Sequence, residues 1–270
     1  MTGGRVVPQS LTGSHGLADR CLVITGTSTD VGKTVVTAAL AVTLVDRGVD
    51  VAVCKPAQTG VGPDGPGDLA TVTALAGALP THECVRFADP LAPETAARHA
   101  GTPQADRGTM GDQIAGFVAA HQMTLVEGSG GLLVRLAPEH TILDVAAALA
   151  ADVLVVVDPA LGALNHAELT VRAIRSAGLR PAGLVLGSWP GTPDLAMRCN
   201  REDLPRLTGV PVVGVLPAGA GGRSRAEFTE TAPGWFDPGW IESLTPTTPM
   251  PSPQSVPAPP SVPAHQGVHP

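Results

Sequence analysis

Residues 21–34 read CLVITGTSTDVGKT, an apolar run that passes into a glycine-containing loop and ends in Gly-Lys-Thr. A helix-like pattern then runs from Lys33 to a stop at Gly48, so the loop joins a strand to the start of a helix. Backbone N–H groups in such a loop, together with the positive end of the helix dipole, bind phosphate oxygens. Lys33 adds a positive charge for the outer phosphates, and the Thr34 hydroxyl can ligate Mg²⁺. The stretch therefore predicts a loop that binds a nucleoside triphosphate.

The loop is longer than the usual P-loop, in which four residues separate the first glycine from the Gly-Lys pair. Here the five residues 27–31 lie between Gly26 and Gly32. The strand before the loop and the helix after it still favour phosphate binding. The predicted nucleotide-binding residues of this segment are Thr29, Asp30, Val31, Gly32, Lys33, Thr34 and Val35.

Apolar runs and helix-like stretches alternate along the rest of the chain. Such alternation predicts an α/β fold with a doubly wound, mostly parallel sheet flanked by helices, as in P-loop NTPases. Ligands of these sheets bind beyond the carboxyl ends of the strands, so the residues that follow each strand are the candidate site. The predicted strands are 21–25, 51–55, 124–127, 153–158, 182–187 and 211–216, with a weaker one at 85–87. The predicted helices are 33–47, 68–78, 141–150, 165–177 and 196–207.

Composition narrows the class of protein. The chain has 270 residues, of which 43% are hydrophobic, enough for one large α/β domain, which we place at residues 20–244. Residues 1–19 are polar and residues 245–270 are proline-rich, so both ends are predicted to be disordered. The net charge of −7 argues against general nucleic-acid binding and against an anionic membrane surface. Four scattered cysteines and the lack of a signal peptide or membrane-length apolar run predict a cytoplasmic protein.

Two further strands end in charged residues. Lys55 leads into Pro-Ala-Gln-Thr-Gly, and Glu127 leads into Gly-Ser-Gly-Gly. Lys55 is expected at the same sheet edge as the P-loop, where a second cation can stabilise charge during phosphoryl transfer. A carboxylate that leaves a buried strand at this edge, as Glu127 does, is well placed to hold Mg²⁺; the alternative is that it only accepts hydrogen bonds from loop amides. Asp68 precedes a helix-like run, so from its position alone it can equally be an N-cap.

These segments together resemble dethiobiotin synthetases. The resemblance extends from about Cys21 to about Leu244. Members of this family also have five residues between the first glycine and the Gly-Lys pair of the P-loop. The matching pieces are TGTSTDVGKT at 25–34, KPAQTG at 55–60, Asp68, LVEGSGGLLV at 125–134 and LGALNHAELT at 161–170.

The resemblance implies an enzyme, a cyclo-ligase of biotin biosynthesis that joins carbon dioxide to 7,8-diaminononanoate with MgATP. One amine forms a carbamate, ATP phosphorylates it, and the second amine attacks the mixed carbamic–phosphoric anhydride to close the ureido ring. The implied catalytic residues are Lys33, Lys55, Thr29 and Asp30. The implied metal ligands are Thr34, Asp68 and Glu127.

The substrate-binding residues are also implied by the resemblance. Thr29 and Asp30 are expected to approach the reacting amine and the carbamate, and Thr59 to donate to the carbamate. Lys55 is also expected to bind substrate. In the family, a helix start supplied by the opposite subunit binds the carboxylate of the substrate, which implies a homodimer; Asn165 can alternatively serve only as a helix cap. The residues of this segment are Gly162, Ala163, Leu164 and Asn165.

The base of the nucleotide is where the sequence departs from the family pattern. After the strand at 182–187, many members carry an asparagine that pairs with adenine, and this chain has Gly187 followed by Ser188. Backbone groups there and at Pro217, Ala218 and Gly219 are the remaining candidates for contact with the base. Without a side-chain amide, we expect relaxed choice, with CTP or other triphosphates supporting turnover comparably to ATP. The alternative is that Ser188 or a backbone carbonyl replaces the missing contact.

Two other classes of protein share related loops. A P-loop ATPase switch of the chromosome-partitioning type would act by binding partners, but such proteins usually carry a second lysine where this chain has Thr27. An amidotransferase-type synthetase would need a glutaminase domain with a nucleophilic cysteine, for which the predicted domain leaves no room. The resemblance therefore favours small-molecule substrates and no nucleic-acid or membrane partner.

Overall fold

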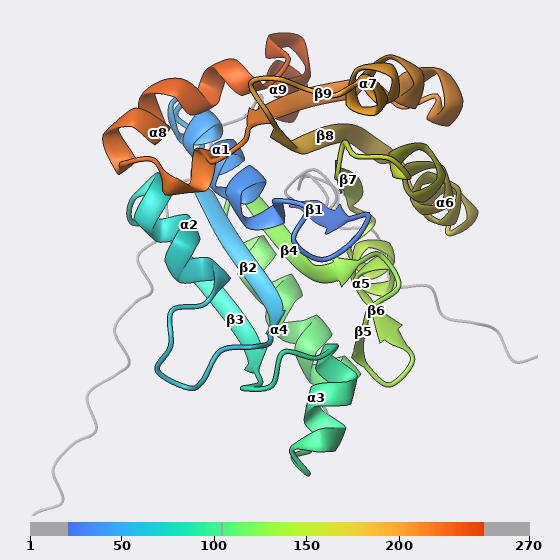
Figure 1. The fold of residues 1–270 in the computed structure, drawn as a ribbon. Coiled ribbons are helices and arrows are strands. Elements are labelled where there is room, and N and C mark those ends of the chain that lie inside the picture. Colours follow the sequence, from blue (N-terminus) through green and yellow to red (C-terminus); the bar gives the residue numbers. More distant parts are fainter. Residues whose placement is uncertain (1–20, 104, 246–270) are drawn as a thin grey trace, which may run out of the picture.

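The computed structural model describes residues 21–103 and 105–245, and the extensions predicted at 1–19 and 245–270 lie outside these residues except for Thr245. Within the described residues, seven strands form one parallel sheet in the order β3-β2-β4-β1-β7-β8-β9, with helices on both faces (Figure 1). The predicted α/β fold is confirmed. The strands are β1 (Cys21–Gly26), β2 (Val51–Gln58), β3 (Thr81–Arg86), β4 (Met123–Gly131), β7 (Asp152–Val157), β8 (Pro181–Trp189) and β9 (Val212–Pro217).

Strand β1 lies at the centre of the sheet and is buried along its whole length. It pairs in parallel with β4 on one side and with β7 on the other. Its residues are apolar on both faces because helices cover both, which is the usual condition of a parallel sheet. The loop after β1 therefore emerges at the middle of the carboxyl edge, between the ends of β4 and β7.

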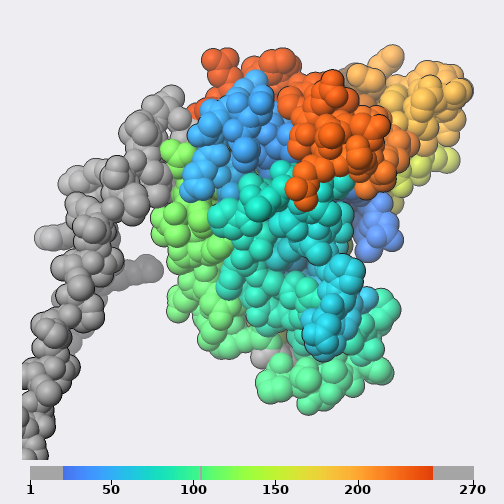
Figure 2. All heavy atoms as spheres, turned by 90° about the vertical axis from the view of Figure 1, so that its left-hand side faces the viewer, coloured from blue at the N-terminus to red at the C-terminus, as the bar shows by residue number. Residues whose placement is uncertain are grey.

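The helices pack on the two faces of the sheet through two apolar cores. One core joins the sheet to α1 (Lys33–Val45), α2 (Asp68–Ala76), α8 (Arg225–Thr231) and α9 (Pro238–Leu244). The other joins it to α4 (Arg107–Ala119), α5 (Ile142–Leu149), α6 (Ala163–Ser176) and α7 (Leu195–Thr208). In Figure 2, α1, α2 and α8 lie side by side over one face, in agreement with their contacts.

Several elements have patterns too weak to predict. Helix α4 contains three glycines, which are poor helix formers, and its buried stripe is only Met110, Ile114 and Val118. Helix α3 (Pro93–His99) and the hairpin of β5 (Arg135–Ala137) and β6 (His140–Thr141) are too short for a periodic signal. Helices α8 and α9 are also short, and two 3₁₀ turns lie at Ala220–Gly222 and Ala232–Trp235.

The observed boundaries of other elements differ by a few residues from the predicted ones. Strand β4 continues through the glycines to Gly131, and β8 continues to Trp189, so both are longer than predicted. The weak strand at 85–87 is β3, which begins earlier at Thr81. No helix in the described part of the chain combines the length and apolar character that crossing a membrane requires.

Candidate active site

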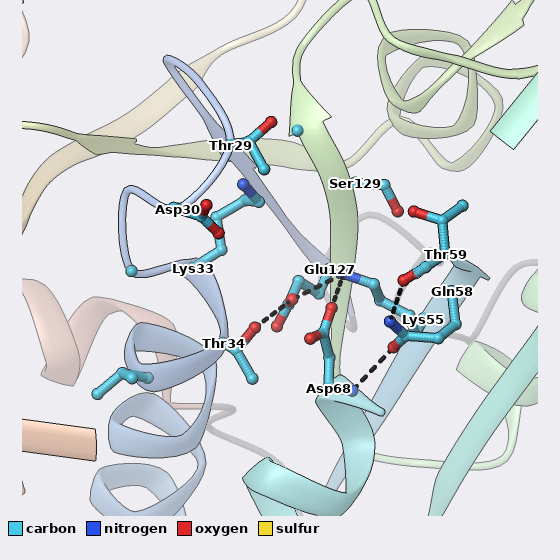
Figure 3. A pocket seen from close by; sticks show the side chains of 13 residues that line it. Thr29, Asp30, Lys33, Thr34, Lys55, Gln58, Thr59, Asp68, Glu127 and Ser129 are labelled. Carbon is cyan, nitrogen blue, oxygen red and sulfur yellow. Dashed lines mark hydrogen bonds and ion pairs between the residues drawn. The ribbon is translucent and has the colours of Figure 1, made fainter. Parts of the chain in front are cut away.

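A pocket of about 370 Å³ opens at the carboxyl edge of the sheet, where β1, β2 and β4 end (Figure 3). The parallel topology brings together segments that are far apart in the sequence, as the strand-end argument predicts. The pocket is lined by Thr29, Asp30, Gly32, Lys33, Thr34, Val35, Lys55, Gln58, Thr59, Asp68, Glu127, Ser129 and Gly130.

The P-loop presents the start of α1 to this pocket. The N-cap residue, Gly32, adopts a left-handed conformation with φ 96° and leaves the helix without a side-chain cap. The first N–H groups of an uncapped helix are free to bind an anion, and the helix dipole favours negative charge there. Lys33 folds back over the loop, and its Nζ donates to the Ser28 carbonyl at 3.0 Å. A phosphate can replace this carbonyl as the partner of Lys33.

A buried carboxylate organises the centre of the pocket. Glu127 is 1% exposed. Its Oε1 accepts from the Thr34 hydroxyl and from Lys55 Nζ, both at 2.8 Å. Its Oε2 accepts from the Thr37 hydroxyl at 2.7 Å. Each oxygen is thus held by a donor, which fixes the orientation of the carboxylate.

Lys55 lies between two carboxylates. Its Nζ is 2.8 Å from Glu127 Oε1 and 2.5 Å from Asp68 Oδ2. Burial acts to lower the pKa of Lys55, but Glu127 and Asp68 raise it, and the net pKa lies above its ordinary value. The pKa of Lys33 is lowered, first by burial and then by repulsion from Lys55. The chain contains only these two lysines, and both line the pocket.

Asp68 does not cap helix α2. It is the first residue of the helix, and the N-cap is Gly67, which has no side chain of its own to cap the helix. The carboxylate turns instead toward Lys55 (Figure 3). The N-cap interpretation of Asp68 is therefore wrong, and the residue belongs to the charged cluster of the pocket.

The donor set suits Mg²⁺. This ion prefers oxygen ligands and is usually bound by one or two carboxylates together with substrate phosphates. Asp68 and Glu127 supply the carboxylates, and the Thr34 hydroxyl lies at hydrogen-bond distance from Glu127. No cluster of three or more His, Cys, Asp or Glu side chains able to hold a metal occurs within residues 21–103 and 105–245. Two carboxylates and a hydroxyl fit an ion that completes its coordination with the phosphates of a nucleotide.

The region predicted to bind the base of the nucleotide, at the ends of β8 and β9, is formed by backbone contacts rather than by charged side chains. Gly187 is buried in β8, and a Cβ there would lie 1.9 Å from the Val31 carbonyl oxygen. Strand β8 thus packs directly on the P-loop, and this contact requires glycine. Ser188 beside it is exposed, and Ala218 N donates to the Trp189 carbonyl at 2.8 Å. None of the residues predicted to contact the base, which lie at the ends of β8 and β9, lines the pocket described above.

The segment at the start of α6 also lies outside this pocket. Gly162 is the N-cap, with φ 105°, and the helix has no side-chain cap, so the interpretation of Asn165 as a cap is wrong. Asn200 on α7 holds the loop that precedes α6, because its side-chain amide donates to the carbonyls of Pro159 at 2.9 Å and Ala160 at 3.0 Å. The neighbouring Leu161 is 89% exposed.

Three side chains that line or support the site were not predicted from the sequence. Thr37 is a buried polar residue in the apolar helix α1, three residues after Thr34, and that spacing is the signal that could have found it. The Ser129 hydroxyl donates to the Ala57 carbonyl at 2.6 Å and ties the end of β4 to β2. Gln58, at the end of β2, contacts the start of α2.

Comparison with known proteins identifies the family. A family model described as an AAA domain matches residues 20–220. The chain is 55% identical over 223 residues to the ATP-dependent dethiobiotin synthetase BioD of Rhodococcus jostii, covering 82% of this chain and 96% of that protein. It is 53% identical over 218 residues to the enzyme of the same name from Streptomyces coelicolor, covering 80% and 92%.

A solved structure shares the fold at greater distance. The cell division ATPase MinD of Pyrococcus furiosus has a TM-score of 0.51 at 21% identity, covering 84% of this chain and all of that one. Such a likeness supports the fold and gives the partner-binding switch no more than a distant structural relationship. The similarity to the synthetases, by contrast, spans most of both chains at more than twice that identity. The chain belongs to the ATP-dependent dethiobiotin synthetase family.

Proposed function

We propose that the chain makes dethiobiotin from 7,8-diaminononanoate, carbon dioxide and ATP, releasing ADP and phosphate, as a cyclo-ligase of biotin biosynthesis. The observation that carries this proposal is the convergence of both lysines of the chain with two carboxylates in one pocket at the end of the P-loop. Such a cluster suits transfer of a phosphoryl group between two anions.

The phosphates of the nucleotide are proposed to lie on the uncapped start of α1. Thr34, Asp68 and Glu127 would hold Mg²⁺, which supplies positive charge at the outer phosphates when bound. Lys55 lies between the two carboxylates and keeps both in place. Thr37 keeps Glu127 oriented from within α1. The protein thus presents its metal-binding oxygens already arranged.

Charge repulsion is the main obstacle to the reaction. Two unit negative charges 4 Å apart repel by about 4 kcal/mol at an effective dielectric constant near 20. A carbamate oxygen must nevertheless approach the γ-phosphorus. Lys33, released from the Ser28 carbonyl, and Lys55 can both contact the anions as they approach. We assign Thr29, Asp30 and Thr59, which line the same pocket, to the amine and the carbamate.

The proposed steps need no nucleophile from the protein. A carbamate oxygen forms a bond to the γ-phosphorus while the bond to the ADP oxygen breaks. The second amine then attacks the carbamate carbon, loses a proton, and expels phosphate as the ring closes. The substrate supplies both nitrogen atoms, so the protein needs only to position the reactants and offset their charge.

We further propose a two-fold homodimer in the cytoplasm. Leu161, just before α6, and Leu169, in the middle of the helix, are 89% and 59% exposed, an apolar surface suited to a partner subunit. The segment Gly162 to Asn165 lies apart from the pocket of its own chain, which supports a role in that of the partner. The four cysteines are free thiols, which fits a reducing compartment.

The proposed activity is tested by incubating the protein with MgATP, labelled bicarbonate and diaminononanoate. We expect label in acid-stable dethiobiotin, and no label when either the diamine or ATP is omitted. Light scattering on the same sample tests the dimer. A fully active monomer would refute the role of α6 across the subunit interface without affecting the reaction assigned to the pocket.

A further inference from the structure

Gln58 joins two sides of the pocket through one side-chain amide. It is the last residue of β2 and is only 4% exposed. Its Oε1 accepts from the backbone N–H of Asp68 at 2.8 Å, and its Nε2 donates to the Thr59 carbonyl at 3.0 Å (Figure 3). Asp68 belongs to the metal side of the proposed site and Thr59 to the substrate side.

The start of α2 depends on this contact. Its N-cap, Gly67, has no side chain to satisfy the first amides of the helix, and Gln58 satisfies one of them from a neighbouring strand. A Cβ on Gly67 would lie 2.7 Å from Gln58 Oε1. Glycine at this position is therefore explained by the close approach of the glutamine.

Apart from the ion pair with Lys55, the connection between β2 and α2 gives Asp68 little support. Residues 60–67 include four glycines and two prolines, and no apolar residue of this stretch is fully buried. Arg86 on β3 holds this connection by donating to the carbonyls of Gly62 at 3.1 Å and Gly65 at 2.8 Å. The side chain of Asp68 is 35% exposed, whereas that of Lys55 is 3% exposed. The amide of Gln58 thus gives the backbone of Asp68 a buried hydrogen bond, while the carboxylate of the same residue pairs with Lys55.

We propose that Gln58 is a positioning residue, whose amide sets the Asp68 carboxylate relative to Lys55 and links the metal side of the pocket to Thr59. The inference rests on the proposed function, because that function gives Asp68 and Thr59 their roles. Gln58 itself touches neither metal nor reacting atoms. Its effect passes through the backbone of the two residues that it holds.

The test compares Gln58→Met with Gln122→Met. Methionine keeps the length and volume of glutamine but removes the acceptor and the donor. Gln122 offers a matched control, because its Oε1 accepts from the backbone N–H of Asp50 at 2.8 Å, at the amino ends of β2 and β4. The two variants thus lose the same kind of contact at opposite edges of the sheet.

The first measurement is hydrogen–deuterium exchange of residues 59–70 without nucleotide or metal. Loss of one hydrogen bond is expected to speed exchange at the Asp68 amide about tenfold in Gln58→Met and to leave it unchanged in Gln122→Met. Gln58→Glu keeps an acceptor for that amide and is expected to retain slow exchange, which also provides a folded variant should the methionine variant fail to fold.

The second measurement is calorimetric titration of Mg²⁺ into each protein saturated with ATP. We expect about tenfold weaker Mg²⁺ binding for Gln58→Met and wild-type binding for Gln122→Met. Fast exchange with unchanged Mg²⁺ binding would overturn the positioning role, as would equal weakening in both variants. These readouts do not involve product formation, so failure of the wild type to make dethiobiotin would count against the proposed function alone.

Discussion

The two halves of the carboxyl edge use different chemistry. At the ends of β1, β2 and β4, charged side chains converge: Lys55 lies within hydrogen-bond distance of Asp68 and Glu127, and Lys33 lines the same pocket. At the ends of β8 and β9, contact is made by backbone, with Gly187 against the Val31 carbonyl and Ala218 against Trp189. The first half can hold and move charge. The second can shape a space but has few side chains with which to recognise a particular base.

The largest effect is expected on the charged half. Lys55→Ala should lower kcat at least a hundredfold, about 3 kcal/mol, because it removes a cation that offsets charge in the transition state. It also leaves Asp68 and the buried Glu127 without their shared partner. Steady-state kinetics at saturating substrates measure the loss, with circular dichroism to show that the variant is folded. A folded variant of normal activity would remove the catalytic role of this lysine.

The two carboxylates should respond differently to neutralisation. Asp68→Asn and Glu127→Gln are both expected to raise the half-saturating Mg²⁺ concentration about tenfold or more. Glu127→Gln should also lower the melting temperature, because the buried carboxylate accepts from Thr34, Thr37 and Lys55. The half-exposed Asp68 should tolerate the change with little loss of stability. A variant of Asp68 that loses stability but keeps its Mg²⁺ dependence would contradict its assignment as a ligand.

The half of the edge at the ends of β8 and β9, where the contacts are made by backbone, can be tested by adding a methyl group at Gly187. Gly187→Ala would place Cβ against the Val31 carbonyl, so we expect a loss of about 1–3 kcal/mol in the free energy of unfolding and a higher KM for ATP. Gly191→Ala is the matched control, since nothing lies within 4 Å of its Cβ. Chemical denaturation measures both variants. Equal stability of the two would mean that β8 does not pack on the loop as described.

The same half should discriminate weakly among bases. With no side-chain amide at Gly187, turnover with ATP, CTP, GTP and UTP at equal subsaturating concentrations is expected to be comparable. A preference for ATP above about a hundredfold would show a dedicated contact, with Ser188 as the first residue to examine.

This contrast explains what could be predicted from the sequence. The sheet and the positions of Lys33, Lys55 and Glu127 follow from strand ends and motif residues, because charged groups at such ends are visible in the sequence. Thr37 and Gln58 were missed, because their roles arise from contacts between separate elements. Gly187 was read as the loss of a side chain, whereas the structure shows a glycine required by packing. Helix α4 was missed because its glycines hide a narrow apolar stripe.

The smallest expected effect is on the pH dependence of stability, and it concerns His140, which lies away from both halves of the carboxyl edge. This residue is 3% exposed, and within the described residues neither ring nitrogen has a hydrogen-bond partner. Burial lowers its pKa below the ordinary 6.5, so the unfolded chain takes up a proton more readily. The stability contributed by the neutral ring is present above pH 6.5 and is lost as the pH falls through the folded-state pKa. His140→Phe should therefore lose less unfolding free energy than the wild type between about pH 7 and pH 5; equal pH profiles would contradict this.

The central claim is that the charged half couples phosphate release to ring closure. A single-turnover experiment with ATP labelled at the γ-phosphate and labelled bicarbonate tests it most directly, in the wild type and in Lys55→Ala. We expect equal amounts of phosphate and dethiobiotin from the wild type at every time point, and neither product from the variant within the same interval. Phosphate released by the wild type without dethiobiotin would refute this coupling and favour an ATPase switch.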